Sequence, residues 1–452
     1  MSVRPVPRPA SARPASARPV HARGIAQLLL ALALLAGLIS GSDARAGLAS
    51  TATRGGADPV AMAAMAATAA PAARRPFPQH VKYTKSVLVP QVPSATRDSV
   101  TLRFWRAWKS RYLRTRGSPG IWVQHTRGTN VSESTGYGMV LSAYFGDRRT
   151  FDGLYRHFRA HPSRYSPDLM AWKQKLIDGR MVDVAGRDSA TDGDLDIAYA
   201  LLLAHRQWRS RGPIDYRAQS LLVSRAALAH DVNPRLGNTT PGDWAAGKDT
   251  RRTRTSDFMP AHFDAFARVD PDSAWQWRRV KRSTSAIALA QFRNGSRRTG
   301  LLPDFMAYRR GEWRPVRGVY LESKHDGDFG YNSCRDPWRL SLPYLLMGQR
   351  RLRPLLLKHT VWLRTATNGD PAQIRAGYYV RNGPNGQPYR NYPDLAFTAP
   401  AAVNAMLGGE GGQRWLNRLW RAITRGPSTS NYYSDSLRLM ALLILGRNWW
   451  QP

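Results

Sequence analysis

The chain has 452 residues, enough for one large domain or two ordinary ones with a sizeable buried core. Its formal net charge of +36 is compatible with nucleic acid, a membrane surface or an acidic polymer as partner. Because the arginines are spread along the chain, we favour a solvated basic surface and expect no nucleic-acid partner. A single cysteine, Cys334, excludes an intramolecular disulfide and any zinc site built from several cysteines, and we expect it to be a small core residue.

The first 46 residues have the form of a secretory signal peptide. Five prolines and five arginines occupy the first 23 residues, and an apolar run follows from Ile25 to Ile39. Ala44-Arg45-Ala46 offers an A-x-A cleavage site, and the run is too short for a secure membrane span. We therefore predict a secreted or periplasmic protein, with an uncleaved anchor as the alternative. Removal of residues 1–46 takes away six arginines and Asp43 and leaves a charge of +31.

Residues 47–76 are rich in Ala, Gly and Pro and lack apolar periodicity, which predicts a flexible linker. The folded domain is then expected to span residues 77–452. Its first helix is predicted over 98–113, where large apolar residues recur every four positions. A short strand-like segment, Ile121-Trp122-Val123, follows it.

Glu133 stands among small hydroxyl residues just before Gly136-Tyr137-Gly138 and a helix predicted over 139–144. The glycines permit close approach of the backbone to a ligand, and Tyr137 can offer that ligand a flat face. Taken alone, Glu133 is more simply explained as an ordinary first-turn carboxylate, which the helix dipole stabilises.

Three aspartates crowd the start of a helix predicted over 189–208: Asp192, Asp194 and Asp196. Asp192 or Thr191 can cap the free amides of this helix. Capping explains one or two acids better than three, since close carboxylates repel and raise each other's pKa. A calcium loop is excluded, because its sixth and twelfth positions would be Ile197 and Leu203 instead of Gly and Glu.

Helical periodicity recurs with short gaps along the rest of the chain. The predicted segments are 151–161, 214–230, 260–268, 271–290, 335–349, 413–424 and 432–445. Strand-like runs are few and short, such as Val361-Trp362-Leu363 and Tyr378-Tyr379-Val380. About a dozen helices without alternating strands predict an all-α architecture of helical hairpins.

Aromatic residues crowd the predicted connections between helices. Flat aromatic faces beside carboxylates suit sugar rings, although a core position is the simpler explanation for most tryptophans. The aromatic residues placed in connections are Trp122, Tyr137, Trp172, Trp244, Trp313, Tyr331 and Trp338.

Several motifs occur together and in one order. The segment Ala190-Thr191-Asp192-Gly193-Asp194 with its helix resembles the signature of glycoside hydrolase family 8. The segment Ser132-Glu133-x-x-Gly136-Tyr137-Gly138-Met139 looks like that family's proton-donor motif. Further matches are residues 299–305, the stretch 331–340 and the C-terminal YYSDSLRLMALLILGRNWW. The resemblance extends from residue 77 to the end of the chain.

The resemblance implies an (α/α)6 barrel with a substrate groove across one end, and hydrolysis by single displacement with inversion. In such enzymes an acid and a base stand roughly 6.5–9.5 Å apart. Glu133 matches the general acid, and we expect burial or the nearby Asp192 to raise its pKa. Asp192 matches an active-site carboxylate that orients the sugar. The mechanism needs no cofactor, and no spacing of His, Cys or acids suggests a metal site.

The general base departs from the commonest pattern of the family. Most members place an aspartate where this chain has Asn332, and an amide cannot take a proton from water. One subgroup, which includes chitosanases and lichenases, also has asparagine there and takes its base from a glutamate in the preceding loop. By resemblance Glu322 is the base, with Asp326 and Asp328 as rivals in the same loop.

The substrate-binding residues implied by the resemblance are Trp172, Tyr137, Tyr331, Asn332 and Arg335, with Trp172 as a stacking platform. The sequence thus predicts a secreted, monomeric, inverting endo-glycosidase that acts on a β-1,4-linked glucan of cellulose or mixed-linkage type. Chitosan is the rival substrate, and the charge of the mature chain argues against a cationic polymer. A non-catalytic polysaccharide-binding protein is the alternative from a different class.

Overall fold

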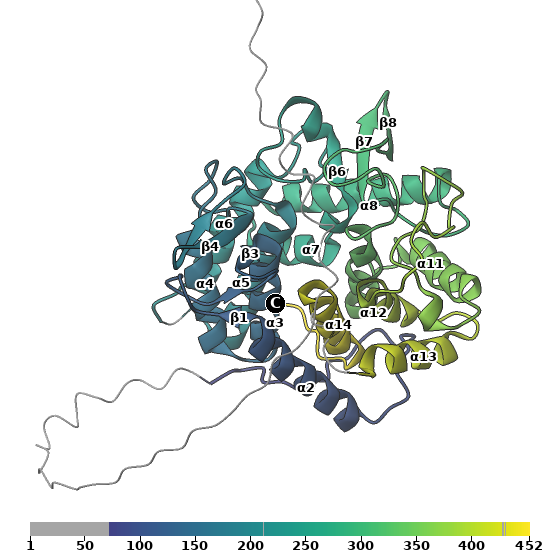
Figure 1. Cartoon of the computed structure of the whole chain (residues 1–452), viewed down its shortest axis with the longest axis horizontal. Helices are drawn as coiled ribbons and strands as arrows, with labels where there is room; N and C mark the ends of the chain where they lie inside the picture. The colour runs from purple at the N-terminus through teal and green to yellow at the C-terminus, as the bar shows by residue number, and fades with distance from the viewer. Residues whose placement is uncertain (1–71, 211, 427–428, 430) are drawn as a thin grey trace, which may run out of the picture.

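The computed structural model describes residues 72–452 except 211, 427–428 and 430. These residues form two concentric rings of helices, an (α/α)6 barrel (Figure 1). Among the described residues the outer helices are α2 (Ser94–Tyr112), α4 (Arg148–Ala160), α6 (Tyr216–His230), α8 (Ala274–Asn294), α11 (Arg353–Ala366) and α13 (Gly412–Thr424). The inner helices are α3 (Ser132–Tyr144), α5 (Thr191–Trp208), α7 (Pro260–Val269), α9 (Asp336–Arg339), α12 (Leu395–Ala405) and α14 (Tyr432–Leu445). Figure 1 shows α3, α5, α7, α12 and α14 enclosed by the outer helices. The predicted all-α barrel is confirmed.

The pattern of apolar residues decides which helix lies inside. The inner helices α3, α5 and α14 are buried on nearly all sides, as expected for helices without a charged face. The outer helix α4 instead buries one stripe, which includes Phe151, Leu154 and Phe158, and leaves Arg149 and Arg156 exposed. Cys334 is buried in the core, as predicted.

Two glycines allow α3 and α5 to pack in close contact. A Cβ added to Gly193 would lie 2.4 Å from Ser132 Oγ, and one added to Gly136 would lie 2.8 Å from Asp196 Cβ. Larger residues would therefore push the two helices apart. The prediction that Gly136 lets the backbone approach a ligand differs from its role in the structure, which is helix packing that brings the first turns of α3 and α5 together.

Short antiparallel strands decorate the barrel. The pair β1 (Leu113–Arg114) and β2 (Trp122–Val123) stands alone. The first three-stranded sheet contains β3 (Thr129–Val131), β4 (Lys173–Ile177) and β5 (Arg180–Asp183), and the second contains β6 (Arg252–Arg254), β7 (Phe305–Arg309) and β8 (Glu312–Pro315). The 3-10 helices are η1 (Gly247–Arg251), η2 (Thr255–Asp257), η3 (Ser333–Arg335) and η4 (Pro371–Gln373). Since β3 leads directly into α3, and β6 and η2 lead into α7, the strands fix where these inner helices begin.

Three predicted elements differ from the structure. Residues 361–363, which look strand-like, lie inside α11, because the local apolar run is the buried stripe of a longer helix. Residues 378–380 are not a strand either, since only Tyr378 pairs, in isolated bridges with Phe329 and Pro388. The helix predicted over 335–349 is broken into η3, α9 and α10 (Leu342–Met347), and Pro337 and Pro343 each stand in the first turn of a new helix.

The last residues of the predicted linker lie against the barrel. The backbone N–H of Arg74 donates to the Gln207 carbonyl at 2.9 Å, and that of Arg75 donates to Gln207 Oε1 at 2.9 Å. The predicted signal peptide 1–46 and the linker up to residue 71 lie outside the described residues. Within the described residues, no helix is long and apolar enough to span a bilayer.

Candidate active site

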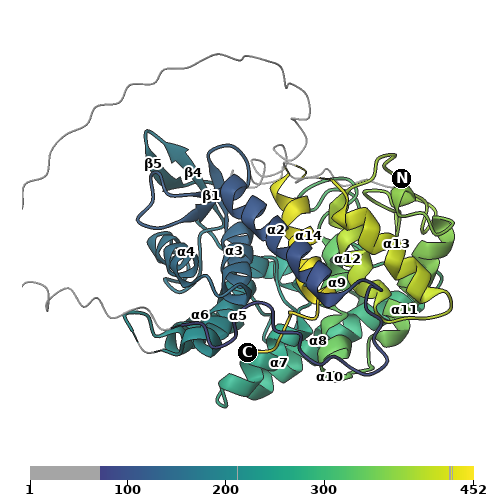
Figure 2. The same cartoon turned by 90° about the horizontal axis from the view of Figure 1, so that it is seen from below.

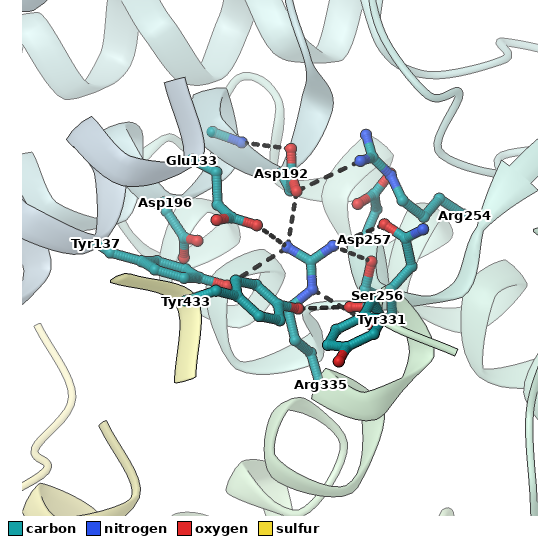
Figure 3. Close-up of polar contacts among 12 residues, drawn as sticks. Glu133, Tyr137, Asp192, Asp196, Arg254, Ser256, Asp257, Tyr331, Arg335 and Tyr433 are labelled. Atoms are coloured by element: carbon teal, nitrogen blue, oxygen red, sulfur yellow. Dashed lines mark hydrogen bonds and ion pairs between the residues drawn. The ribbon is translucent and has the colours of Figure 1, made fainter. Parts of the chain in front are cut away.

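The inner helices begin at a common cluster of polar side chains (Figure 3). Glu133 lies in the first turn of α3 and Asp192 in that of α5. Tyr432 is the first residue of α14, and Arg335 immediately precedes α9. Because the N-terminal end of a helix carries partial positive charge, this arrangement favours carboxylates at the cluster.

Arg335 is the centre of the cluster and is 1% exposed in its side chain. Its Nη1 donates to Glu133 Oε2 at 2.8 Å and to Asp192 Oδ2 at 2.7 Å. Its Nη2 donates to Ser256 Oγ at 2.8 Å and to Asn332 Oδ1 at 3.1 Å. One guanidinium therefore fixes the relative positions of four side chains from four segments of the chain (Figure 3).

Glu133 combines burial with a partly reachable carboxyl group. Burial raises its pKa to about 7; Asp192 adds to the increase, while Arg335, Arg254 and a hydrogen bond from Tyr432 oppose it. The Tyr432 hydroxyl donates to Glu133 Oε1 at 3.2 Å. The Glu133 side chain is 16% exposed, so its proton is not sealed inside the protein.

The pKa of Asp192 is shifted in the opposite direction to that of Glu133. Burial raises the pKa of Asp192, but Arg254 and Arg335 lower it more, and the net pKa lies below the ordinary value. Arg254 Nη1 lies 3.5 Å from Asp192 Oδ2, and the Gly193 backbone N–H donates to Oδ1 at 3.0 Å. The environments of Glu133 and Asp192 thus shift the two pKa values in opposite directions. Such a difference is typical of sites in which one carboxyl group donates a proton and its neighbour stays ionised.

Glu322 lies on the other side of Asn332. The Asn332 Nδ2 donates to Glu322 Oε2 at 3.0 Å, while the Oδ1 of the same amide accepts from Arg335. Burial raises the pKa of Glu322, and Arg254 and the Asn332 hydrogen bond oppose the increase. Glu133 and Glu322 are therefore connected through Arg335 and Asn332, one carboxyl group at each end.

The rival carboxylates of the same loop are occupied by the backbone. Asp326 and Asp328 are both buried. The Asp326 carboxylate accepts from four backbone N–H groups, those of Tyr320, Leu321, Glu322 and Ser323. The Asp328 carboxylate accepts from the backbone N–H groups of Val380, Arg381 and Asn382. It also contacts the side chains of Asn382 and His325. Both aspartates thus hold the loop in shape.

The aromatic residues differ in what they can reach. Trp172 is half-buried beside the start of α3, and its carbonyl accepts from the Ser132 N–H at 2.9 Å. Tyr331 is also half-buried, and its hydroxyl donates to Asp394 Oδ2 at 2.8 Å. Tyr137 is fully buried with its ring edge-on to Trp338. Protein therefore covers the flat face that the sequence predicts for a ligand, and the Tyr137 hydroxyl lies 3.4 Å from Arg335 Nη1 instead.

Once the motif assigns Asp192 to the active site, we expect the other two aspartates, Asp194 and Asp196, to shape the turn and cap α5; the prediction of a cap is wrong. Asp196 makes a two-pronged ion pair with Arg339, at 2.8 and 2.6 Å, and contacts His262 Nε2 at 2.9 Å. Asp194 accepts from the Met170 N–H at 3.0 Å, and burial holds its pKa well above the ordinary range. Both residues point sideways from the helix into neighbouring segments, where a capping residue would point along the axis.

Four residues of the cluster are not among those predicted from the sequence, namely Arg254, Ser256, Asp257 and Tyr432. Tyr432 stands in the C-terminal stretch that matches the family, so a signal is present. Arg254 is one of three arginines in the segment RRTRTSD, and nothing in that segment distinguishes it. Burial raises the pKa of Asp257 to about 7, while Arg254, whose Nε lies 3.3 Å from its Oδ2, opposes that increase.

The cluster is suited to proton transfer. It contains two carboxyl groups with a pKa near neutrality, those of Glu133 and Asp257. It also contains Asp192, whose pKa is lowered, and Glu322 on the other side of the Asn332 amide. Within the described part of the chain, no three His, Cys, Asp or Glu side chains are grouped as metal ligands.

Comparison with known proteins gives consistent matches. A family model described as Glycosyl hydrolases family 8 matches residues 76–447. A beta-glucanase of Niallia circulans is 38% identical over 387 residues, which cover 84% of this chain and 92% of that protein. An endoglucanase of Bacillus sp. (strain KSM-330) is 30% identical over 405 residues, which cover 84% of this chain and 82% of that one. The apo structure of a beta-1,3-1,4-glucanase from Paenibacillus sp. X4 matches with a TM-score of 0.80 and 36% identity, covering 84% of this chain and 100% of that one.

Proposed function

The chain belongs to family 8 of the glycosyl hydrolases and is a glycoside hydrolase, and we propose from this that it cleaves internal β-1,4 bonds of a glucan with inversion. In this proposal Glu133 is the general acid, Glu322 is the general base and Asp192 orients the sugar at the cleaved bond. The arrangement of Glu322 and its neighbours carries the assignment.

Glu133 is proposed to protonate the leaving oxygen. With a pKa of about 7, about half of the Glu133 carboxyl groups are protonated at neutral pH, and the side chain is 16% exposed. Once the proton has left, Arg335 and the Tyr432 hydroxyl stabilise the new carboxylate at contacts of 2.8 and 3.2 Å. Asp192 stays ionised beside Arg254 and Arg335, which suits it to accept hydrogen bonds from sugar hydroxyls.

Glu322 is proposed to take a proton from the attacking water. Asn332 occupies its Oε2, while its Oε1 has no hydrogen-bond partner among the residues that the structure describes. That oxygen is free to hold a water molecule. Asp326 and Asp328 are poor candidates, because each would have to give up backbone hydrogen bonds to accept one. This difference supports the asparagine-bearing subgroup as the one to which the chain belongs.

For the substrate we propose a mixed-linkage β-glucan ahead of cellulose. Two of the similar proteins carry the names beta-glucanase and beta-1,3-1,4-glucanase, and both match over most of their length. Chitosan is less suitable, because Glu133, Asp192 and Asp257 each lie beside an arginine and have little charge left for an ammonium group. Trp172 and Tyr331 are the proposed aromatic contacts to the glucan, while Asn332 and Arg335 hold the reacting groups in place.

The test is reducing-sugar release from lichenan, carboxymethyl-cellulose and chitosan, with the anomeric form of the first product followed by NMR. We expect the fastest release from lichenan and an inverted product. Glu133→Gln and Glu322→Gln serve as inactive controls with unchanged fold. A product of retained configuration would refute the mechanism, and fastest release from chitosan would refute the substrate.

We also propose that the protein is exported and acts as a monomer. The basic start, the apolar run to Ile39 and the Ala44-Arg45-Ala46 site support export. The N-terminal residue of the protein recovered from culture medium would test cleavage after residue 46, and light scattering would test the monomer.

A further inference from the structure

A basic cavity is lined by residues of α7, α8 and α10 and of the segments next to them. Figure 2 shows these three helices on the opposite side of the barrel from β4 and β5. Its volume is about 490 Å³, within the range of small-molecule sites. Most of its charged lining is cationic: Arg278, Lys281, Arg282, Arg350 and Arg351, against the single acid Asp264.

The one acid of the cavity is already neutralised. Lys281 Nζ contacts both oxygens of Asp264, at 2.7 and 2.6 Å, and the Gln349 amide donates to Asp264 Oδ2 at 3.0 Å. Lys281 and Asp264 therefore cancel each other's charge. The charge that remains in the cavity belongs to the four arginines.

These arginines stand without a partner among the described residues. Arg278, Arg282, Arg350 and Arg351 are exposed, and none makes an ion pair or side-chain hydrogen bond with any residue that the structure describes. Some exposed arginines elsewhere do pair with acids, as Arg225 does with Asp270 at 2.6 Å. Four guanidinium groups gathered around one cavity repel one another, and a bound anion would relieve that repulsion.

The arginines come as two pairs from two segments of the chain. Arg278 and Arg282 are four residues apart on α8 and so share one face of that helix, while Arg350 and Arg351 follow α10. Trp275, which is 58% exposed, stands one turn before Arg278 on the same face. Planar guanidinium groups bind phosphate with two parallel hydrogen bonds, and an exposed aromatic ring beside them adds a flat apolar contact.

We propose that this cavity binds a ligand that carries two or more phosphate groups, one for each arginine pair. The residues that line the cavity include none of the proposed catalytic residues, so this site is separate from the hydrolytic one. A neutral glucan has no charge to match the arginines, and the proposal does not depend on the proposed reaction. The phosphates could belong to a free small anion or to lipid headgroups. In the second case Trp275 would lie at the membrane interface.

The first arm of the test is calorimetric titration of the full chain with pyrophosphate at 0.15 M salt. The test variants are Arg278→Gln/Arg282→Gln and Arg350→Gln/Arg351→Gln. The control is Arg297→Gln/Arg298→Gln, which removes two exposed arginines near the far end of α8, outside the cavity. We expect each test variant to weaken binding at least tenfold and the control to change it less than twofold, with unchanged melting temperatures.

The second arm is co-sedimentation with vesicles of phosphatidylglycerol or of phosphatidylcholine. Pyrophosphate binding that only the test variants lose supports a free anion as ligand. Binding to phosphatidylglycerol alone, abolished in the test variants and in Trp275→Ala but kept in the control, supports a headgroup. Absence of binding in both arms, or equal loss in test and control variants, overturns the proposal, because net charge would then explain any attraction.

Discussion

The Asn332 side-chain amide donates to the Glu322 carboxylate at 3.0 Å, and its oxygen accepts from Arg335 at 3.1 Å. Asn332 thus holds the Glu322 carboxylate in place, at a position where the commonest pattern of the family has an aspartate. Because Arg335 also contacts Glu133, a change at either end of this chain of contacts should be felt at the other.

The base assignment predicts different losses at Glu322 and Asp326. Glu322→Gln should lower kcat about 10²- to 10⁴-fold with little change in melting temperature, since it removes a proton acceptor and keeps the shape. Asp326→Asn should destabilise the fold by about 1–3 kcal/mol, because its amide nitrogen meets backbone N–H groups that need an acceptor. Parallel kinetics and thermal melts check both. A fully active Glu322→Gln would contradict the assignment.

Asn332→Asp should move the acidic limb of the pH profile of kcat/KM to higher pH. A carboxylate in contact with Glu322 Oε2 would raise the pKa of Glu322, which must be ionised to act as base. We expect a displacement of about one pH unit. Rates between pH 4 and pH 9 on lichenan measure it, and a displacement to lower pH would show that Glu322 is not the base.

The raised pKa of Glu133 predicts a loss of activity at high pH. The acid must be protonated, so kcat/KM should fall about tenfold for each pH unit above 7. The basic limb should move to higher pH when Tyr432→Phe removes a hydrogen bond that favours the ionised form. An unmoved basic limb in this variant would indicate that another group sets it.

The same pKa predicts a pH-dependent stability difference. The pKa of Glu133 rises from 4.5 to about 7 on folding, so the folded state binds more protons than the unfolded state between these values. Stability from this group is therefore full at low pH and is lost as pH rises through 7. Glu133→Gln should remove the loss and gain up to roughly 3 kcal/mol relative to wild type between pH 4 and pH 8. Urea unfolding at both pH values measures it.

Asp196 and Arg339 form a buried ion pair, and neither has a role in the proposed reaction. We expect that breaking this pair lowers the free energy of unfolding by a large amount. Both side chains are nearly fully buried, so Arg339→Met would leave an uncompensated carboxylate and cost about 3–5 kcal/mol. The double variant Asp196→Asn/Arg339→Met should recover part of that loss. Denaturant unfolding of the two single variants and the double variant gives the coupling energy. Additive losses would mean that the two groups do not stabilise each other.

Trp172→Ala should raise KM for the glucan about tenfold with a smaller change in kcat, because removal of a stacking surface away from the reacting bond weakens binding. Trp172→Phe, which keeps a flat ring, should recover part of the affinity. The ring is held by a hydrogen bond of 3.1 Å from its Nε1 to the Ala185 carbonyl, which phenylalanine cannot make. Equal KM values for the two variants would argue against stacking.

Helix α14 illustrates what can be predicted from sequence. Its bounds, Tyr432–Leu445, coincide with those predicted, because a long apolar segment after Asn431 has one plausible helical register. Helix α12 is absent from the prediction, since Pro400 interrupts its pattern and its apolar residues show little periodicity when every side is buried. The prediction for residues 361–363 is wrong for a related reason, because three apolar residues do not distinguish a strand from a helix.

The sequence by itself determined the helical class and the order of the motifs, and the resemblance of those motifs to family 8 marked Glu133, Asp192 and Glu322 as candidates. These features are local, carried by residues at fixed spacing along the chain. Only the tertiary structure placed Arg254, Ser256 and Tyr432 beside them, because those residues come from segments far apart in sequence. It also distinguished Glu322 from Asp326. The sequence shows only two acids in one loop, whereas the structure shows that backbone N–H groups occupy the Asp326 carboxylate and that Asn332 occupies one oxygen of Glu322.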